Sequence, residues 1–331
     1  MSCSISLFRV MLAVALAFAL SGCGRLSTDI ASPAAPGAER RIVLSFDDVP
    51  RSRGPWLTPD ERSRTLIAAL RRAGVRQAAF FVTPGNLAQP DGAGGEARIS
   101  AYVRAGHVIA NHSFAHRALS EMSAPDYLAD IDRAEAFLRG RPGYRPWFRF
   151  PFLNEGRADA AKRDAVFAGL AERGLSHGFV TIDASDWHLE QLAIEAREAG
   201  PTVNRDALRD LYIESHVEAA EFYHQLLART PQRGAAHVML LHETDLAALW
   251  IDDLVAALRD RGWRVVRADE GFAQPIGRIV PRVPSGQGPL SELIAWEAGL
   301  PAPRWYERNR MSVMRALFEQ RVLGAELPRR E

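Results

Sequence analysis

Cysteine is nearly absent from this sequence. The 331 residues contain only Cys3 and Cys23, both near the start of the chain. The rest of the chain therefore has no material for a disulfide or for a cysteine-ligated metal cluster. A metal ion bound there must be held by histidine, aspartate or glutamate.

A surplus of positive charge is also missing. Lys and Arg total 41 against 40 Asp and Glu, giving a formal net charge of +1, and no lysine- or arginine-rich block occurs. Nucleic-acid binding needs a basic surface, so we expect no nucleic-acid partner. The 47% of hydrophobic residues is typical of a globular protein with a substantial core, in one large domain or two.

The sequence has no apolar run long enough to cross a membrane comfortably. The longest, residues 10–20, follows Arg9 and precedes small residues, the layout of a secretory signal. It ends in Leu20-Ser-Gly-Cys23, which resembles a bacterial lipoprotein box. The resemblance implies a signal peptide over 1–22, a lipid on Cys23, a tether over 23–40, and a body attached to a membrane of the cell envelope, facing the periplasm or exterior. An uncleaved anchor and a plain secretory signal with a chance cysteine are the alternatives.

From residue 41 onward, short apolar runs alternate with amphipathic stretches of helical period. This alternation predicts βα units around a parallel sheet, and seven such units can close into a barrel. An open doubly wound sheet is the alternative, but no GxGxxG follows the first strand. The seven expected strands lie within 42–46, 78–83, 107–111, 147–150, 177–182, 237–241 and 263–266.

Two segments depart from the alternation. Residues 188–231 contain two helical patterns with no strand between them, which we interpret as a helical insertion in a catalytic domain over 41–270. Residues 271–331 are rich in proline at first and then form a short helical pattern. We interpret them as a C-terminal extension to which the sequence assigns no chemistry.

Polar residues stand at the carboxyl ends of several predicted strands. Asp47 and Asp48 end the first strand, and His112 and His116 follow the third. The ends of barrel strands share one rim, so these side chains can converge. A His-x-x-x-His pair on one side of a helical turn, with one carboxylate, suits a zinc ion that keeps a position open for water. By itself the pair is a weak signal, and two solvated helix histidines are the alternative.

Five motifs occur in a fixed order: SFDD (45–48), HSFAH (112–116), RPWFRFPF (145–152), DASDW (183–187) and LLH (240–242). Together they resemble the polysaccharide deacetylase family, which comprises carbohydrate esterases of family 4 type with the NodB homology domain. Val49 stands where the family has glycine, and Phe152 replaces the commoner tyrosine. The resemblance implies a distorted (β/α)7 barrel that removes N-acetyl groups from amino sugars of a polysaccharide or oligosaccharide.

The resemblance also implies a role for each matching residue. A divalent metal, usually zinc with cobalt or nickel as alternatives, would be bound by Asp48, His112 and His116. Asp47 would be the general base, and Arg149 would orient it. The remaining roles concern the leaving group and the acetyl pocket: Asp186 would tune the general acid His242, the backbone amide of Phe152 beside Pro151 would bind the oxyanion, and Trp187 with Leu240 would wall the pocket.

The chemistry of amide hydrolysis needs these groups independently of any resemblance. A metal ion and an N–H stabilise the oxyanion, a free carboxylate accepts the proton of water, and a carboxylate-bound histidine protonates the leaving amine. Structural alternatives remain for three features: a helix cap at Asp47-Asp48, an Arg149–Asp186 ion pair, and core packing of Trp187. Asp245, Asp252 and Asp253 are expected on a solvated helix face.

Three functions are compatible with these motifs. The first is a metal-dependent N-deacetylase of an envelope or extracellular glycan. The second is an O-acetyl esterase, for which replacing His242 should cost less because an alkoxide leaves more easily than an amine. The third is a catalytically silent carbohydrate-binding lipoprotein, although none of the matching residues is missing.

Overall fold

The computed structural model describes residues 39–325. The predicted signal peptide and Cys23, and nearly all of the predicted tether, lie outside this range. Among the described residues, no helix combines the length and apolar character needed to span a membrane.

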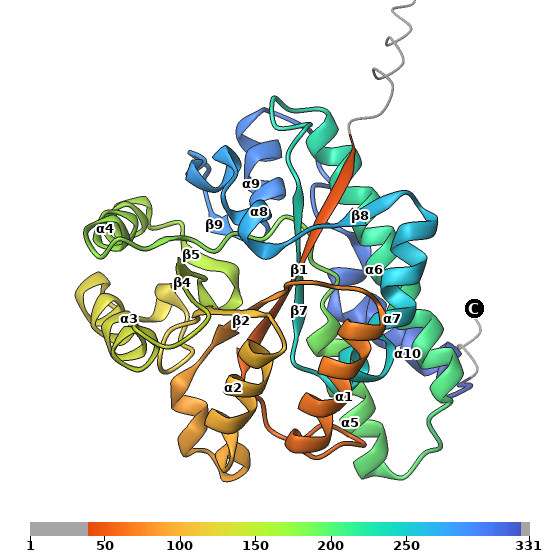
Figure 1. Cartoon of the computed structure of the whole chain (residues 1–331). Coiled ribbons are helices and arrows are strands. Elements are labelled where there is room, and N and C mark those ends of the chain that lie inside the picture. Colours follow the sequence, from red (N-terminus) through yellow and green to blue (C-terminus); the bar gives the residue numbers. More distant parts are fainter. Residues whose placement is uncertain (1–38, 326–331) are drawn as a thin grey trace, which may run out of the picture. The chain divides into compact units, whose positions relative to one another are not determined.

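A seven-stranded parallel sheet forms the centre of the fold (Figure 1). Six strands follow the order β6-β4-β3-β2-β1-β7, and β8 pairs with the beginning of the long β1. Strands therefore occur at all seven predicted positions, but the fifth is much shorter than predicted: β6 covers only residues 176–177 of the region around the predicted 177–182. Their bounds are β1 (Arg40–Val49), β2 (Ala79–Val82), β3 (Val108–Asn111), β4 (Tyr144–Phe148), β6 (Ser176–His177), β7 (His237–His242) and β8 (Trp263–Val265).

The sheet closes on itself through the segment that follows β6. Ile182 forms a parallel bridge with Met239 of β7, and the N–H of Leu240 donates to the carbonyl of Ile182 at 2.9 Å. The segment that leaves β6, at one edge of the sheet, thus reaches β7 at the opposite edge. The result is the distorted barrel that the sequence predicts, closed by a short irregular contact instead of a full strand pair.

Helices surround the sheet, with α6 and α7 on one side of the view in Figure 1 and α3 and α4 on the other. The sequence at the start of α1 explains why that helix begins there. The Thr58 side chain accepts the N–H of Glu61, the Glu61 carboxylate accepts the N–H of Thr58, and Pro59 occupies the first turn. The helices are α1 (Pro59–Arg72), α2 (Gly95–Arg104), α3 (Ala124–Leu138), α4 (Ala160–Glu172), α5 (Asp186–Ala199), α6 (Arg205–Ala228), α7 (Asp245–Asp260), α8 (Ala268–Phe272), α9 (Leu290–Glu297) and α10 (Met311–Arg321).

Two helices, α5 and α6, follow each other without an intervening strand, where the sequence shows its two uninterrupted helical patterns. Whether they constitute an insertion in a smaller domain stays a prediction. The C-terminal segment adds α9, α10 and the strand β9 (Gly286–Gln287), which pairs antiparallel with β5 (Asn154–Arg157).

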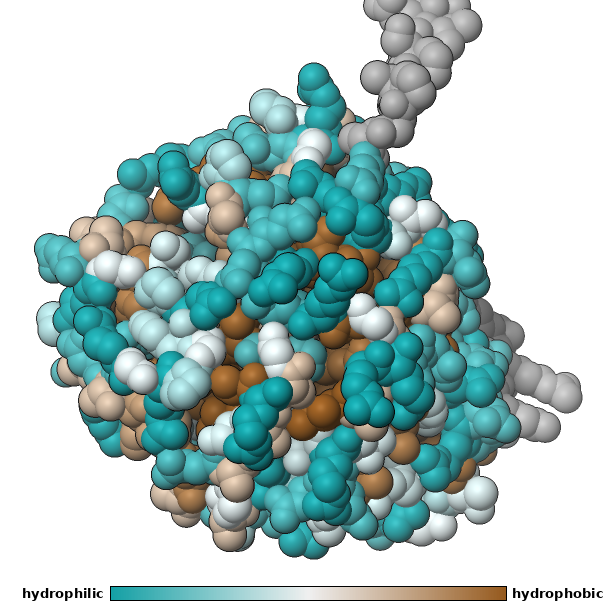
Figure 2. Space-filling model, in the orientation of Figure 1, coloured by the Kyte–Doolittle hydropathy of each residue, from teal (hydrophilic) through white to brown (hydrophobic). Residues whose placement is uncertain are grey.

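Strand β1 separates two apolar layers. Ile42, Leu44 and Phe46 pack in the large core beneath the helices, while Val43 belongs to a second cluster with residues such as Phe81. Alternate residues of a strand face opposite sides, so Ser45 and Asp47 follow Val43 toward the second cluster. The outer face is hydrophilic over most of the view in Figure 2, and hydrophobic residues reach the surface mainly near its centre.

The structure corrects one expectation for α7. Asp245 is fully buried instead of lying on a solvated helix face. Its carboxylate accepts the N–H groups of Trp56 and Leu57 at 2.8 Å and lies 3.5 Å from the buried guanidinium of Arg62. The carboxylate therefore anchors the loop that connects β1 to α1. Asp253 is exposed, as predicted.

Candidate functional site

A cavity of about 530 Å³ opens at the carboxyl ends of the strands. Volumes between roughly 300 and 1,000 Å³ are typical of small-molecule sites. The five sequence motifs all contribute to it. The cavity is lined, from these motifs, by Asp47, Asp48, His112, His116, Phe152, Asp183, Ser185, Trp187, Leu240 and His242.

An irregularity at the end of β1 brings its two aspartates to one cavity. Neighbouring residues of a regular strand point to opposite faces. Here the register with β2 shifts between Phe46 and Val49, and Asp48 has a φ of 65°. Such a bulge redirects the strand locally, and aspartate tolerates the left-handed region better than most residues. Helix α1 is capped by Thr58, so the aspartate pair is not a helix cap.

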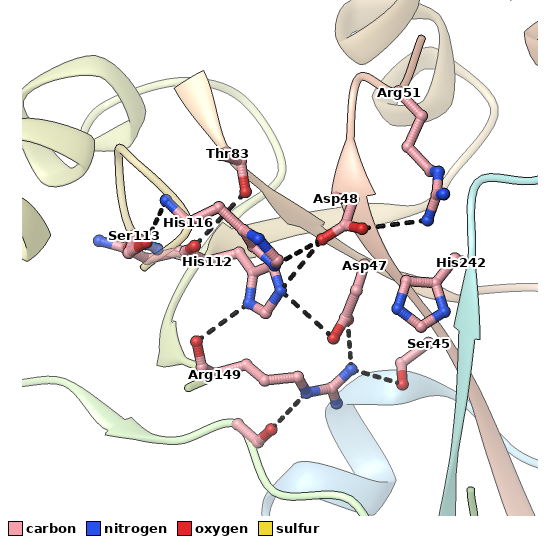
Figure 3. A network of polar contacts seen from close by, with 12 residues as sticks. Ser45, Asp47, Asp48, Arg51, Thr83, His112, Ser113, His116, Arg149 and His242 are labelled. Atoms are coloured by element: carbon pink, nitrogen blue, oxygen red, sulfur yellow. Dashed lines mark hydrogen bonds and ion pairs between the residues drawn. The ribbon is translucent and has the colours of Figure 1, made fainter. Parts of the chain in front are cut away.

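Three side chains converge as a metal-ligand set (Figure 3). His116 Nε2 lies 2.8 Å and His112 Nε2 lies 3.4 Å from Asp48 Oδ1. One ligand atom from each of the three residues lies within 4.8 Å of the others. Within residues 39–325, these three are the His, Cys, Asp and Glu side chains that lie close enough together, three or more in a group, to hold a metal ion.

The two histidines lie on a loop, which corrects the prediction of a helical turn. Residues 112–118 contain no helix, and Ser113 and His116 adopt positive φ angles of 63° and 51°. Side chains fix this loop in place of helical bonds. Asp130 accepts the N–H groups of Phe114 and Ala115, and Ser113 Oγ accepts the N–H of His116.

The set fits a divalent cation. Asp48 Oδ1 is buried and has no aligned hydrogen-bond donor among the described residues. Burial raises the pKa of the Asp48 carboxyl, but the charge of His116 and the contacts with both imidazoles outweigh it and hold the pKa well below its usual value. His112 Nδ1 lies 3.0 Å from the carbonyl of Arg149, which orients its ring with Nε2 toward the site. One carboxylate and two imidazoles form a common zinc-ligand set.

Asp47 is bound by arginine instead. Arg149 Nη1 lies 2.6 Å from Asp47 Oδ1, and both side chains are buried. The same guanidinium donates to Ser45 Oγ and to the carbonyls of Gly178 and Phe179, and it stacks 3.8 Å from the ring of Phe81. The partner of Arg149 is thus Asp47, and the alternative of an Arg149–Asp186 pair is not what the structure shows.

His242 lies on the other side of the cavity from the His112 loop (Figure 3) and is paired with Asp186. Its Nδ1 is 2.7 Å from Asp186 Oδ1, and its backbone N–H donates to Asp186 Oδ2 at 2.8 Å. Burial lowers the pKa of His242, but the charge and hydrogen bond of Asp186 outweigh it and raise the pKa to about 9. The Asp186 pKa is lowered by the same pairing, against the effect of burial.

Three of the remaining predicted residues line the cavity, whereas Pro151 is buried beside it. Phe152 is 58% exposed and Trp187 is 38% exposed, and both line the cavity with Leu240. Trp187 is therefore not a core residue. Pro151 begins the short turn of Phe152, whose φ is 58°, and the Phe152 ring lies 4.6 Å from that of His116.

Sequence reasoning missed several lining residues. One of them is Arg51, which lies 3.0 Å from Asp48 Oδ2. Asp183 opens the DASDW motif but had no predicted role; it lines the cavity, and burial raises its pKa to about 6. Gln287, Pro289, Glu292, Trp305, Asn309 and Arg310 come from the C-terminal segment to which the sequence assigned no chemistry. The signal for Arg51 was its position four residues after Asp47. No local pattern marks the C-terminal residues.

Comparisons with known proteins extend this description. Residues 34–171 match the family model "Polysaccharide deacetylase". A search of curated proteins finds no match. Among solved structures, a family 4 carbohydrate esterase from Streptomyces lividans is 20% identical over 76% of this chain and 100% of its own, with a TM-score of 0.46. The peptidoglycan deacetylase PdaC from Bacillus subtilis is 17% identical over 70% of this chain and 89% of its own, with a TM-score of 0.44. The chitin deacetylase of Colletotrichum lindemuthianum is 19% identical over 71% of this chain and 88% of its own, with a TM-score of 0.46.

Proposed function

We propose that this chain belongs to the polysaccharide deacetylase family and is a metal-dependent hydrolase that removes N-acetyl groups from amino sugars of a glycan. One observation carries the proposal: a carboxylate held by a buried arginine, Asp47, lies beside the ligand set of Asp48, His112 and His116. The matched family model over residues 34–171 supports it.

Asp48, His112 and His116 would hold the cation, most often zinc. A bound divalent cation polarises a carbonyl and lowers the pKa of water to around 7. Asp47 Oδ2 lies 3.6 Å from His112 Nε2, so this carboxylate borders the ligand set. Its Oδ1 stays bound to Arg149, and the free oxygen is placed to accept a proton from an attacking water.

His242 would donate the proton that the leaving group needs. With a pKa of about 9, it carries its proton at neutral pH. An amine leaves only when protonated, whereas an alkoxide needs less help, so amide cleavage depends on this protonated histidine more than ester cleavage does. Asp186 holds the ring by Nδ1 and leaves Nε2 free for this transfer. Trp187 and Leu240 would wall the acetyl pocket, and the backbone N–H of Phe152 would help to bind the oxyanion.

The full chain loaded with zinc is expected to release acetate from N-acetylated chitooligosaccharides, and O-acetylated xylan is the comparison substrate for the esterase alternative. Asp47→Asn should reduce kcat by at least about a hundredfold, because it removes the proton acceptor. Metal content should stay unchanged, since Asp47 is not a metal ligand in the proposal, whereas the melting temperature should fall because Arg149 loses its buried counter-charge. Absence of acetate from every amino-sugar substrate tested would contradict the proposal, as would full activity of the zinc-free chain.

The pH profile tests the His242–Asp186 pair. Asp186→Asn removes the negative charge that raises the His242 pKa, so the acid would lose its proton at lower pH. The alkaline fall of kcat should then move down by about one pH unit or more. Asp183→Asn is the control, because Asp183 lines the same cavity and also interacts with the charge of His242, but no hydrogen bond joins these two side chains in the structure. Equal shifts in both variants would count against this role of Asp186.

We further propose that the chain is anchored in the cell envelope by lipid on Cys23, facing the periplasm or exterior. The proposal rests on the LSGC sequence after the apolar run. Radiolabelled palmitate should be incorporated into the full chain in bacterial cells and not into Cys23→Ser. Labelling of both forms, or of neither, would contradict it.

A further inference from the structure

The C-terminal segment over 286–310 forms part of the cavity wall. It contributes Gln287, Pro289, Glu292, Trp305, Asn309 and Arg310 to the lining. None of the five motifs reaches this segment, and the family model ends at residue 171. This part of the cavity therefore belongs to features of this chain beyond the motifs.

Backbone contacts fix the first half of the segment against the site. Strand β9 pairs with β5, which directly follows the Phe152 turn. The N–H of Gly288 donates to the carbonyl of Leu153 at 3.1 Å. The N–H of Leu290 donates to the carbonyl of Val180 at 2.7 Å. The segment is thus tied to the elements that carry Phe152 and the DASDW motif.

Asn309 fixes the second half. Its Nδ2 donates to the carbonyl of Asp183 at 3.0 Å, and its Oδ1 accepts from Ser185 Oγ at 3.1 Å. Both partners belong to the loop that delivers Asp186 and Trp187. Trp305, four residues earlier, is therefore held at the same cavity as Trp187.

Aromatic side chains gather at this mouth. Within the described residues, the large hydrophobic side chains classed as exposed are Phe152, Trp187 and Met311. Two of them line the cavity, and Met311 directly follows the lining residue Arg310. Trp305 adds a third, half-buried aromatic ring. Exposed apolar groups clustered at a cavity mark a binding surface, and an indole offers a rigid flat face with a polar edge.

The charges around Trp305 are locally balanced. The Arg310 guanidinium lies 5.7 Å from the Trp305 ring centre, and it pairs with Glu307 at 3.3 Å. Glu292 accepts the Tyr223 hydroxyl at 2.6 Å, and burial raises its pKa to about 8, so it is mostly uncharged at neutral pH. This wall therefore offers an aromatic face and hydrogen-bonding groups without a strong net charge.

From these contacts we infer that Trp305 and its C-terminal segment form a subsite for a second, uncharged sugar ring, next to the ring whose acetyl group is removed. The inference rests on the proposed function. The enzyme would accordingly act on residues within an oligosaccharide or polymer better than on single sugars.

The test measures kcat/KM on chitooligosaccharides of two to five N-acetylglucosamine units and binding of the pentamer by calorimetry, with the full chain. Trp305→Ala should weaken pentamer binding and lower kcat/KM on the pentamer by roughly three- to tenfold. The effect on the monosaccharide should be small. Trp305→Leu keeps an apolar side chain for folding and should show the same loss, whereas Trp305→Phe should keep most of the binding.

Trp296→Ala is the matched control. Trp296 lies in the same segment, on α9, and stacks with Arg304 without lining the cavity. Equal effects of the Trp305 and Trp296 variants, or equal losses at every chain length, would overturn the inference.

Calorimetry in the presence of a chelator separates the two proposals. Loss of pentamer binding in Trp305→Ala supports the subsite even if no acetate is released, while acetate release with unchanged pentamer binding refutes the subsite alone.

Discussion

The buried ion pair between Asp47 and Arg149 is the interaction on which the arrangement of the site depends. Both side chains are almost completely buried. A charge without a partner would be very costly in such a buried position. Removing one partner of such a pair typically costs about 3–5 kcal/mol, because the other charge stays buried. Arg149 also contacts Ser45 and the carbonyls after β6. One guanidinium thus fixes the end of β1 relative to the far side of the barrel.

That pair also explains how two adjacent carboxylates can share one strand end. The bulge at Asp48 turns both side chains into the same cavity, where they would repel each other. Each has a different source of positive charge. Asp47 has the permanent charge of Arg149, while Asp48 faces two imidazoles and, in the proposal, a cation. The environments therefore assign one carboxylate to proton transfer and the other to ligation.

Much of this site could be predicted from the sequence because polar residues interrupt apolar strands at their ends. Asp47, Arg149 and His242 each stand directly beyond a hydrophobic run, His112 follows one after Asn111, and a parallel barrel brings such ends together. The loop of His112 and His116 could not be predicted in this way. Its conformation depends on positive φ angles and on Asp130, sixteen residues from Phe114.

Long-range contacts account for the other misses. The burial of Asp245 follows from its contacts with Trp56, Leu57 and Arg62, more than 180 residues away in the chain. The C-terminal wall depends in the same way on β9 pairing with β5 and on Asn309 meeting Asp183. Neither contact leaves a periodic pattern in the sequence. Local chemistry identified the reactive side of the cavity, whereas the proposed sugar-binding side required the folded chain.

The most direct measurement of the central claim is anomalous X-ray scattering at the zinc edge from crystals grown with zinc. We expect one strong peak bounded by Asp48, His112 and His116, with Asp47 still bound to Arg149. A peak bound by Asp47, or a peak elsewhere with the three-residue set empty, would contradict the division of roles between the two aspartates.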